Sequence, residues 1–142
     1  MEVSQEVANK ILIVENNQAQ QLLYREELEE EGYDVVLVRD GKEALKNLDR
    51  SLFDLIVLDV LIPETDGFEV LGKIVSRHHK IPIILHTSYP RYKSEFISWL
   101  ADATLVKSSD FTQLKRTVKE LLETKPKISG GRSGISPSGG PP

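Results

Sequence analysis

Four apolar runs in this sequence each end in a polar side chain, namely Glu15, Asp59, Thr87 and Lys107. Asp59 directly follows the residues LIVL, a continuous apolar stretch that suits a strand buried on both faces of a parallel sheet. Open α/β sheets place their chemistry at the carboxyl ends of such strands. Asp59 is therefore a candidate nucleophile, and a hydroxyl, an ammonium group and a second carboxylate end the other runs.

Each of these residues alone also has an ordinary structural explanation. An aspartate after an apolar run is more often a strand-end or turn residue than a nucleophile, and an isolated lysine is most often a solvated charge. Thr87 can cap a helix that follows it, and Asn16 or Asn17 can cap the first helix. The joint occurrence of Asp59, Thr87 and Lys107 at three strand ends favours shared chemistry over these separate explanations.

The elements that must position these residues alternate along the chain. Apolar runs predict strands at residues 10–14, 34–38, 55–59, 82–85 and 104–106. Apolar residues at helical spacing predict helices at residues 18–31, 41–50, 68–77, 91–100 and from 111 to about 124. Five repeats of strand then helix predict an α/β fold, a doubly wound five-stranded parallel sheet with right-handed crossovers and helices on both faces.

Composition indicates a single globular domain and excludes several kinds of chemistry. The 142 residues are 39% hydrophobic and 28% charged, and the net charge of -4 gives no electrostatic reason to expect nucleic-acid binding. The absence of cysteine excludes disulfides, thiolate catalysis and cysteine metal sites. No apolar run is long enough to span a bilayer and the first residues lack a secretory pattern, so a cytoplasmic location is expected.

The two ends of the chain differ from the part between them. Residues 1–9 precede the first predicted strand and form an N-terminal extension. Of the 18 residues from Lys125 to Pro142, 13 are Gly, Pro or Ser, too little apolar surface to offset the entropy lost on ordering. We expect residues 125–142 to be a disordered tail, either a linker to a further segment or an expression remnant.

The whole set of motifs resembles the CheY-like receiver domain of two-component response regulators. The resemblance covers about residues 10–124. It rests on ILIVEN at the first strand, RDGKEAL at residues 39–45, Asp59 with Pro63 and Asp66-Gly67 downstream, and then Thr87 and Lys107. It implies a flavodoxin-like (βα)5 fold with strand order 2-1-3-4-5.

The resemblance also implies a role for each strand-end residue. Asp59 matches the aspartate that accepts a phosphoryl group from a histidine kinase or phosphotransfer protein, a reaction that needs an ionised carboxylate and counter-charges. Thr87 matches the hydroxyl that binds a phosphoryl oxygen, and Lys107 matches the lysine that pairs with the carboxylate before transfer and the phosphate afterwards. The residues implied as ligands of Mg²⁺ are Glu15, Asn16, Asp59 and the backbone carbonyl of Leu61.

The sequence departs from the family pattern at the acidic pair. Its second place, usually an acid that touches the metal, is Asn16, so one negative charge is missing opposite a dication. We expect weaker magnesium binding and slower phosphorylation, with Glu15 contributing more of the attraction through water. Restoring the acid is expected to tighten the binding of magnesium.

Three further departures lie beyond the acidic pair. Thr104 occupies the position of the family's aromatic switch residue and has no ring to move, and Ser108 replaces a proline, so no cis bond is expected there. Leu61 and Tyr89 replace polar residues that steer water, which predicts a long-lived phospho-form. His86 precedes Thr87 and is expected to point to the opposite face of the sheet.

Two functions from different classes fit these residues. The first is a phosphorylatable receiver, not an enzyme beyond self-dephosphorylation, which signals to a downstream protein through altered contacts and can form a homodimer through its fourth and fifth strand-helix units. The second is a pseudo-receiver that binds proteins without phosphorylation, which Asn16 and Thr104 favour. Neither function predicts contact with nucleic acid or membrane by this domain.

Overall fold

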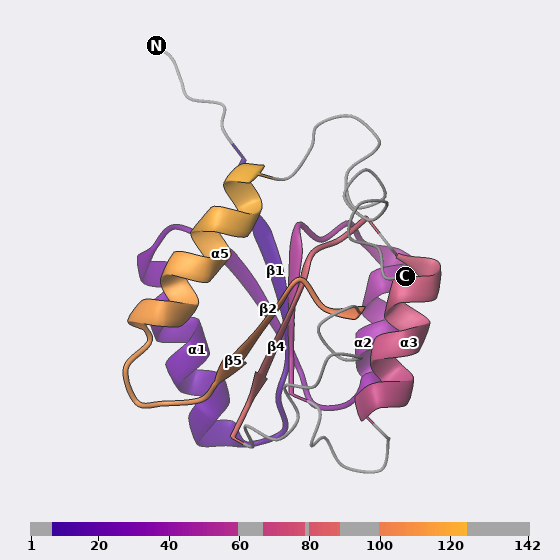
Figure 1. Ribbon diagram of the computed structural model, residues 1–142, viewed down its shortest axis with the longest axis horizontal. Coiled ribbons are helices and arrows are strands. Elements are labelled where there is room, and N and C mark those ends of the chain that lie inside the picture. The colour runs from indigo at the N-terminus through magenta and orange to yellow at the C-terminus, as the bar shows by residue number, and fades with distance from the viewer. Residues whose placement is uncertain (1–6, 60–66, 79, 89–99, 125–142) are drawn as a thin grey trace, which may run out of the picture.

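Five parallel strands form the centre of the structure. They are β1 (Lys10–Val14), β2 (Asp34–Val38), β3 (Leu55–Leu58), β4 (Ile83–Thr87) and β5 (Ala103–Val106). The sheet has the order β2-β1-β3-β4-β5 with every neighbouring pair parallel, which confirms the predicted fold class and strand order. The computed structural model shown in Figure 1 describes residues 7–59, 67–78, 80–88 and 100–124.

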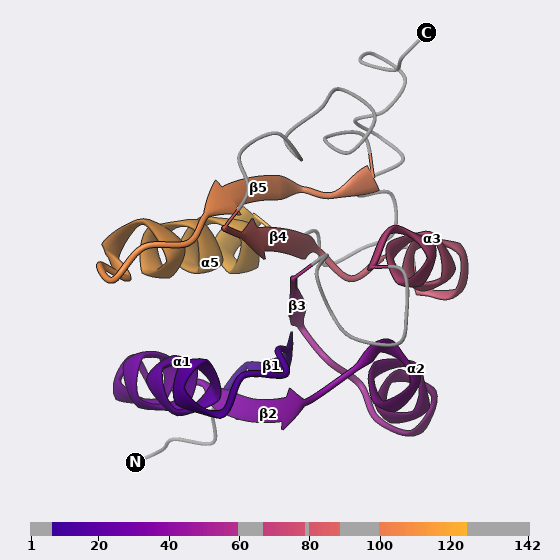
Figure 2. The ribbon, with the colours of Figure 1, turned by 90° about the horizontal axis from the view of Figure 1, so that it is seen from below.

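Helices cover both faces of this sheet. The described residues contain α1 (Gln18–Glu30), α2 (Gly41–Arg50), α3 (Gly67–Arg77) and α5 (Thr112–Thr124). Figure 2 shows α1 and α5 on one face and α2 and α3 on the other, as expected for a doubly wound sheet. The helix predicted at residues 91–100 lies outside the described residues except for its last residue. None of the described helices is long and apolar enough to cross a membrane.

Alternation along the central strands divides the core between these two helical layers. Along β1, Leu12 and Val14 belong to the cluster that packs under α2 and α3, whereas Ile11 and Ile13 belong to the cluster under α1 and α5. All four side chains are at most 1% exposed. The continuous apolar runs are therefore strands buried on both faces, as the parallel sheet requires.

Local signals in the sequence fix the ends of the first two helices. The side chain of Asn17 accepts a hydrogen bond from the backbone of Gln20 and caps α1, and Asp40 caps α2 through the backbone of Glu43. Gly32 follows α1 with φ of 94°, a left-handed conformation that favours glycine. Helix α1 therefore ends just before a glycine that can adopt this conformation.

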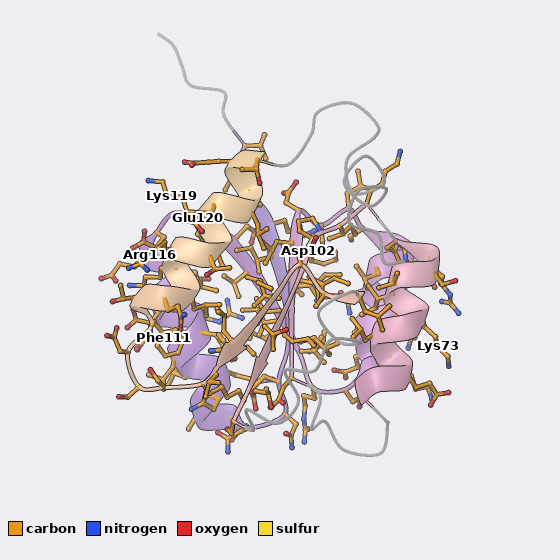
Figure 3. The ribbon with its side chains drawn as sticks, viewed as in Figure 1. Lys73, Asp102, Phe111, Arg116, Lys119 and Glu120 are labelled. Carbon is orange, nitrogen blue, oxygen red and sulfur yellow. The ribbon has the colours of Figure 1, made fainter. Side chains whose placement is uncertain are left out.

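Two aspartates join neighbouring strands at the amino-terminal edge of the sheet. Asp54 directly precedes β3, and its carboxylate accepts a hydrogen bond of 2.8 Å from the backbone N–H of Lys10 in β1. Asp102 directly precedes β5 and accepts a bond of the same length from Ile83 in β4. Figure 3 labels Asp102 at this position. Each carboxylate thus supplies an acceptor for a backbone N–H at the end of a strand, which would otherwise have no partner in the sheet.

Replacing Asp54 by alanine is expected to lower the free energy of unfolding by about 1 kcal/mol, because the N–H of Lys10 then loses a charged acceptor. The measurement is denaturant unfolding of both proteins at pH 7. Asp34→Ala serves as the control, since Asp34 is an exposed residue at the start of β2. Equal unfolding midpoints for the Asp54 variant and the wild type would contradict this role of Asp54.

Candidate functional site

The polar residues singled out by the sequence all lie at the carboxyl edge of the sheet. Glu15 follows β1, Asp59 follows β3, Thr87 ends β4 and Lys107 follows β5. Their backbones continue the strand ladders, since the N–H of Asp59 donates to Val14 and the N–H of Lys107 donates to Thr87 over 2.8 Å. Four neighbouring strands therefore deliver one acid, a second acid, a hydroxyl and an ammonium group to a common edge.

Lys107 connects the two acids of this edge. Its ammonium donates to Asp59 Oδ2 over 2.8 Å and to Glu15 Oε1 over 2.5 Å. The three side chains are nearly buried, with exposed fractions of 13% for Lys107, 4% for Glu15 and 11% for Asp59. Burial lowers the pKa of Lys107, but the hydrogen bonds to Asp59 and Glu15 outweigh it and leave the pKa raised. The site therefore holds a permanent cation between two carboxylates.

The loop after β1 is held in place by its own side chains. The second oxygen of Glu15, Oε2, accepts a bond of 3.0 Å from the backbone of Asn17, and Gln21 of α1 donates its amide to the carbonyl of Glu15 over 2.6 Å. Asn16 lies between these residues and is exposed. Sequence reasoning missed Gln21, although its place one turn into the helix after the loop is a signal that could have found it.

Thr87 and Thr104 lie on adjacent strands close to this edge. Thr87 is fully buried, and Thr104 pairs with Leu85 two residues before it. The hydroxyl oxygen of Thr104 is buried, and the part of the chain that the structure describes offers it no hydrogen-bond partner. Leu61 and Tyr89, predicted to line the site, lie outside the described residues. No cis peptide bond occurs among the described residues, which include Lys107 and Ser108.

His86 points away from Thr87, as the strand alternation predicts. It packs under α1, where its Nδ1 lies 2.6 Å from the hydroxyl of Tyr24. Burial, and then the nearby charge of Lys107, lower the pKa of His86 to about 4, while burial raises the pKa of Tyr24. Both rings are therefore neutral near pH 7, and the hydrogen bond joins the phenol hydroxyl of Tyr24 to Nδ1 of a neutral imidazole.

The residues at this edge fit a hard divalent cation better than a soft one. Glu15, Asp59 and Asn16 offer carboxylate and amide oxygens, which are the ligands that Mg²⁺ prefers. Within the described ranges, no group of three or more His, Cys, Asp or Glu is arranged to hold a metal ion. A magnesium site here thus depends on the amide of Asn16 and on the predicted carbonyl of Leu61.

A parallel sheet of order 2-1-3-4-5 with two acids and a lysine at its carboxyl edge agrees with the resemblance to receiver domains. The chain belongs to the family described as response regulator receiver domain, whose family model matches residues 11–119. It is a CheY-like domain of the two-component signalling type.

Among relatives of known function, the chain is 34% identical over 115 residues to the transcriptional regulatory protein PcoR of Escherichia coli. That match covers 80% of this chain and 51% of PcoR, so the chain spans about half the length of this relative. The match to the regulator PhoP of Bacillus subtilis, 40% identical over 79 residues, covers 56% of this chain and 33% of PhoP.

Among solved structures, the chain is 41% identical to the response regulator TrrA of Thermotoga maritima in complex with Mg²⁺ and beryllofluoride. That likeness has a TM-score of 0.76 and covers 80% of this chain and 98% of TrrA. A second structure shows TrrA in complex with the histidine kinase ThkA, with a TM-score of 0.75 and the same identity and coverage.

Proposed function

We propose that this domain, residues 10–124, is a phosphorylatable receiver whose acceptor is Asp59. The observation that carries the proposal is the buried lysine that bridges Asp59 and Glu15 at the carboxyl edge of the sheet. An ionised carboxylate held beside a permanent cation is the pair of groups that phosphoryl transfer to aspartate needs. Membership of the receiver family supports phosphoryl acceptance at Asp59 as the role of this geometry.

In the proposed reaction an oxygen of Asp59 forms a bond to phosphorus while the bond from phosphorus to the donor breaks. The donor is a phosphohistidine of a kinase or phosphotransfer protein, and its imidazole leaves. Lys107 pairs with Asp59 before transfer and binds the phosphoryl oxygens afterwards, and the hydroxyl of Thr87 donates to one of those oxygens. Glu15, Asn16, Asp59 and the backbone carbonyl of Leu61 would hold a magnesium ion, which would supply further counter-charge for the phosphoryl group. The chain is then a phosphoacceptor and at most catalyses its own dephosphorylation.

Replacing Asn16 by aspartate is expected to tighten magnesium binding at least about fivefold, because one added charge next to the ion contributes about 1 kcal/mol even in a water-like dielectric. The measurement is a calorimetric titration with magnesium chloride at constant ionic strength.

The control for this titration is Asn17→Asp, which adds the same charge one residue further on, where the side chain caps α1. The control is expected to gain clearly less affinity than the Asn16 variant. An unchanged titration for Asn16→Asp, or an equal gain for both variants, contradicts direct ligation at Asn16.

We propose that the phosphodonor docks on the exposed side of α1 next to the site. Leu22 and Leu23 are 57% and 38% exposed there, one turn beyond the loop that holds Glu15. The complex of TrrA with the kinase ThkA supports a histidine kinase as the partner. We propose that phosphorylation changes the contacts of this domain with a downstream protein or with a second copy of the chain. These contacts are proposed to form through the fourth and fifth strand-helix units, and the location is proposed to be the cytoplasm.

The alternative is a pseudo-receiver that binds proteins without phosphorylation. It is favoured by the neutral Asn16 and by Thr104, which has no aromatic ring to move on phosphorylation. A titration with beryllofluoride and magnesium, followed by amide NMR, separates the two functions. A receiver is expected to show saturable shifts at Thr87 and Lys107, whereas a spectrum that does not change would favour the pseudo-receiver.

A further inference from the structure

A polar pair lies inside the apolar core directly beneath the candidate site. Tyr24 of α1 and His86 of β4 are 1% and 5% exposed and lie against the apolar cluster between the sheet and α1 and α5. Their hydrogen bond of 2.6 Å joins residues 62 positions apart. The apolar cluster around the pair includes Phe111 just before α5, which Figure 3 labels.

Three aromatic rings share this position and connect three elements. Tyr24 contacts His86 with ring centroids 5.6 Å apart, Phe111 contacts Tyr24 at 5.7 Å, and His86 contacts Phe111 at 6.4 Å. All three pairs have the edge-to-face geometry that aromatic rings prefer. A displacement of any one ring therefore changes its contacts with the other two, and these rings belong to α1, β4 and the segment between β5 and α5.

The pair is linked to the site through the backbone of β4. His86 immediately precedes Thr87, whose carbonyl accepts the backbone hydrogen bond of Lys107. The charges of Asp59 and Lys107 are close enough to affect the titration of His86, and those of Glu15 and Asp59 affect that of Tyr24. A change in the position of Thr87 or in the charge at Asp59 therefore changes the surroundings of the Tyr24–His86 hydrogen bond.

The hydrogen bond between Tyr24 and His86 fixes the orientation of the two rings, which two apolar side chains could not do in the same way. It holds the imidazole in one orientation and one tautomer, and it fixes the end of β4 against α1. We propose that Tyr24 and His86 are positioning residues of the phosphoryl site, which hold Thr87 in place and couple occupancy of the site to α1 and Phe111. This inference rests on the proposed function, because it concerns the response to a phosphoryl group.

The test is a titration of the wild-type protein and of Tyr24→Phe with beryllofluoride and magnesium. Coupling is reciprocal, so a bond that responds to the mimic must also change the affinity for the mimic. We expect the nitrogen shifts of the His86 imidazole to move in the wild type at saturation. The affinity for the mimic is expected to fall on the order of fivefold in Tyr24→Phe. Tyr33→Phe, which alters a half-buried tyrosine immediately before β2, is the matched control and is expected to retain the wild-type affinity.

A double variant, Tyr24→Phe with His86→Leu, separates positioning from a merely structural role. Replacing both polar partners by apolar groups leaves no buried group unsatisfied and is expected to restore much of the stability that the single variant loses. The proposal predicts that the affinity for the mimic stays reduced in the double variant. Recovery of wild-type affinity together with stability would overturn it.

Failure of this inference can be told apart from failure of the proposed function. If the Thr87 and Lys107 amides of the wild type do not respond to the mimic, the proposed function fails and the inference fails with it. If those amides respond, but the His86 shifts stay constant and Tyr24→Phe binds as the wild type does, only the inference is overturned.

Discussion

Replacing Lys107 by methionine is expected to lower the free energy of unfolding by about 3 kcal/mol near pH 7 in the absence of metal. The ammonium lies between the buried carboxylates of Glu15 and Asp59, which then remain as like charges with no cation between them. Because the raised pKa of Lys107 keeps it protonated, its contribution is complete below about pH 10 and is lost only as the pH rises through that pKa. Denaturant unfolding at pH 7 measures the loss.

A second lysine in the chain provides the control for this prediction. Lys115 also contacts three carboxylates, those of Glu27 and Glu30 on α1 and of Glu31 just after it, but these side chains are 33% to 71% exposed. Lys115→Met is expected to lose much less stability, because exposed ion pairs contribute little. Equal losses in both variants would show that the buried position of Lys107 has no special importance.

The Lys107→Met variant also tests whether the site binds magnesium. The two carboxylates that Lys107 bridges are also proposed magnesium ligands, so the variant has lost the cation that competes for them. Added magnesium is therefore expected to stabilise Lys107→Met more than it stabilises the wild type. The same increment in both proteins would argue against a metal site at Glu15 and Asp59.

Acid is expected to destabilise the fold through His86. Its pKa is about 6.5 in the unfolded chain and about 4 in the folded state, so the folded state resists protonation. The stability linked to His86 is complete above pH 6.5, falls as the pH decreases from 6.5 to about 4, and then stays constant. The total loss is about 3 kcal/mol, since each pKa unit corresponds to about 1.4 kcal/mol.

The acid prediction is measured as the difference between two proteins, because carboxylates titrate in the same range. The wild type and the Tyr24→Phe, His86→Leu double variant are unfolded with denaturant at several values between pH 7 and pH 4. The wild type is expected to lose about 3 kcal/mol more than the variant over this range. Parallel curves for the two proteins would contradict a buried neutral His86.

The fold followed from the sequence because its signals are local. A continuous run such as LIVL predicts a strand buried on both faces, and Gly32 predicts the end of a helix, without knowledge of any distant residue. The carboxyl ends of parallel strands lie at one edge, and the strand order implied by the resemblance to receiver domains placed Glu15, Asp59 and Lys107 on neighbouring strands of that edge.

The layer beneath the site could not be predicted in the same way. The alternation of β4 predicted the face of His86 but not its partner, because Tyr24 lies 62 residues earlier and its helical spacing marks it only as a core residue. Pairings that depend on packing of distant elements carry no local signal.

The central claim is that Asp59 accepts a phosphoryl group, and intact-mass measurement tests it most directly. The protein is incubated with magnesium and a small phosphodonor such as acetyl phosphate, and Asp59→Asn is treated in parallel. The proposed function predicts that the wild type gains the mass of one phosphoryl group and that the variant gains none. A wild type with no added mass, or an equal gain in Asp59→Asn, would contradict it.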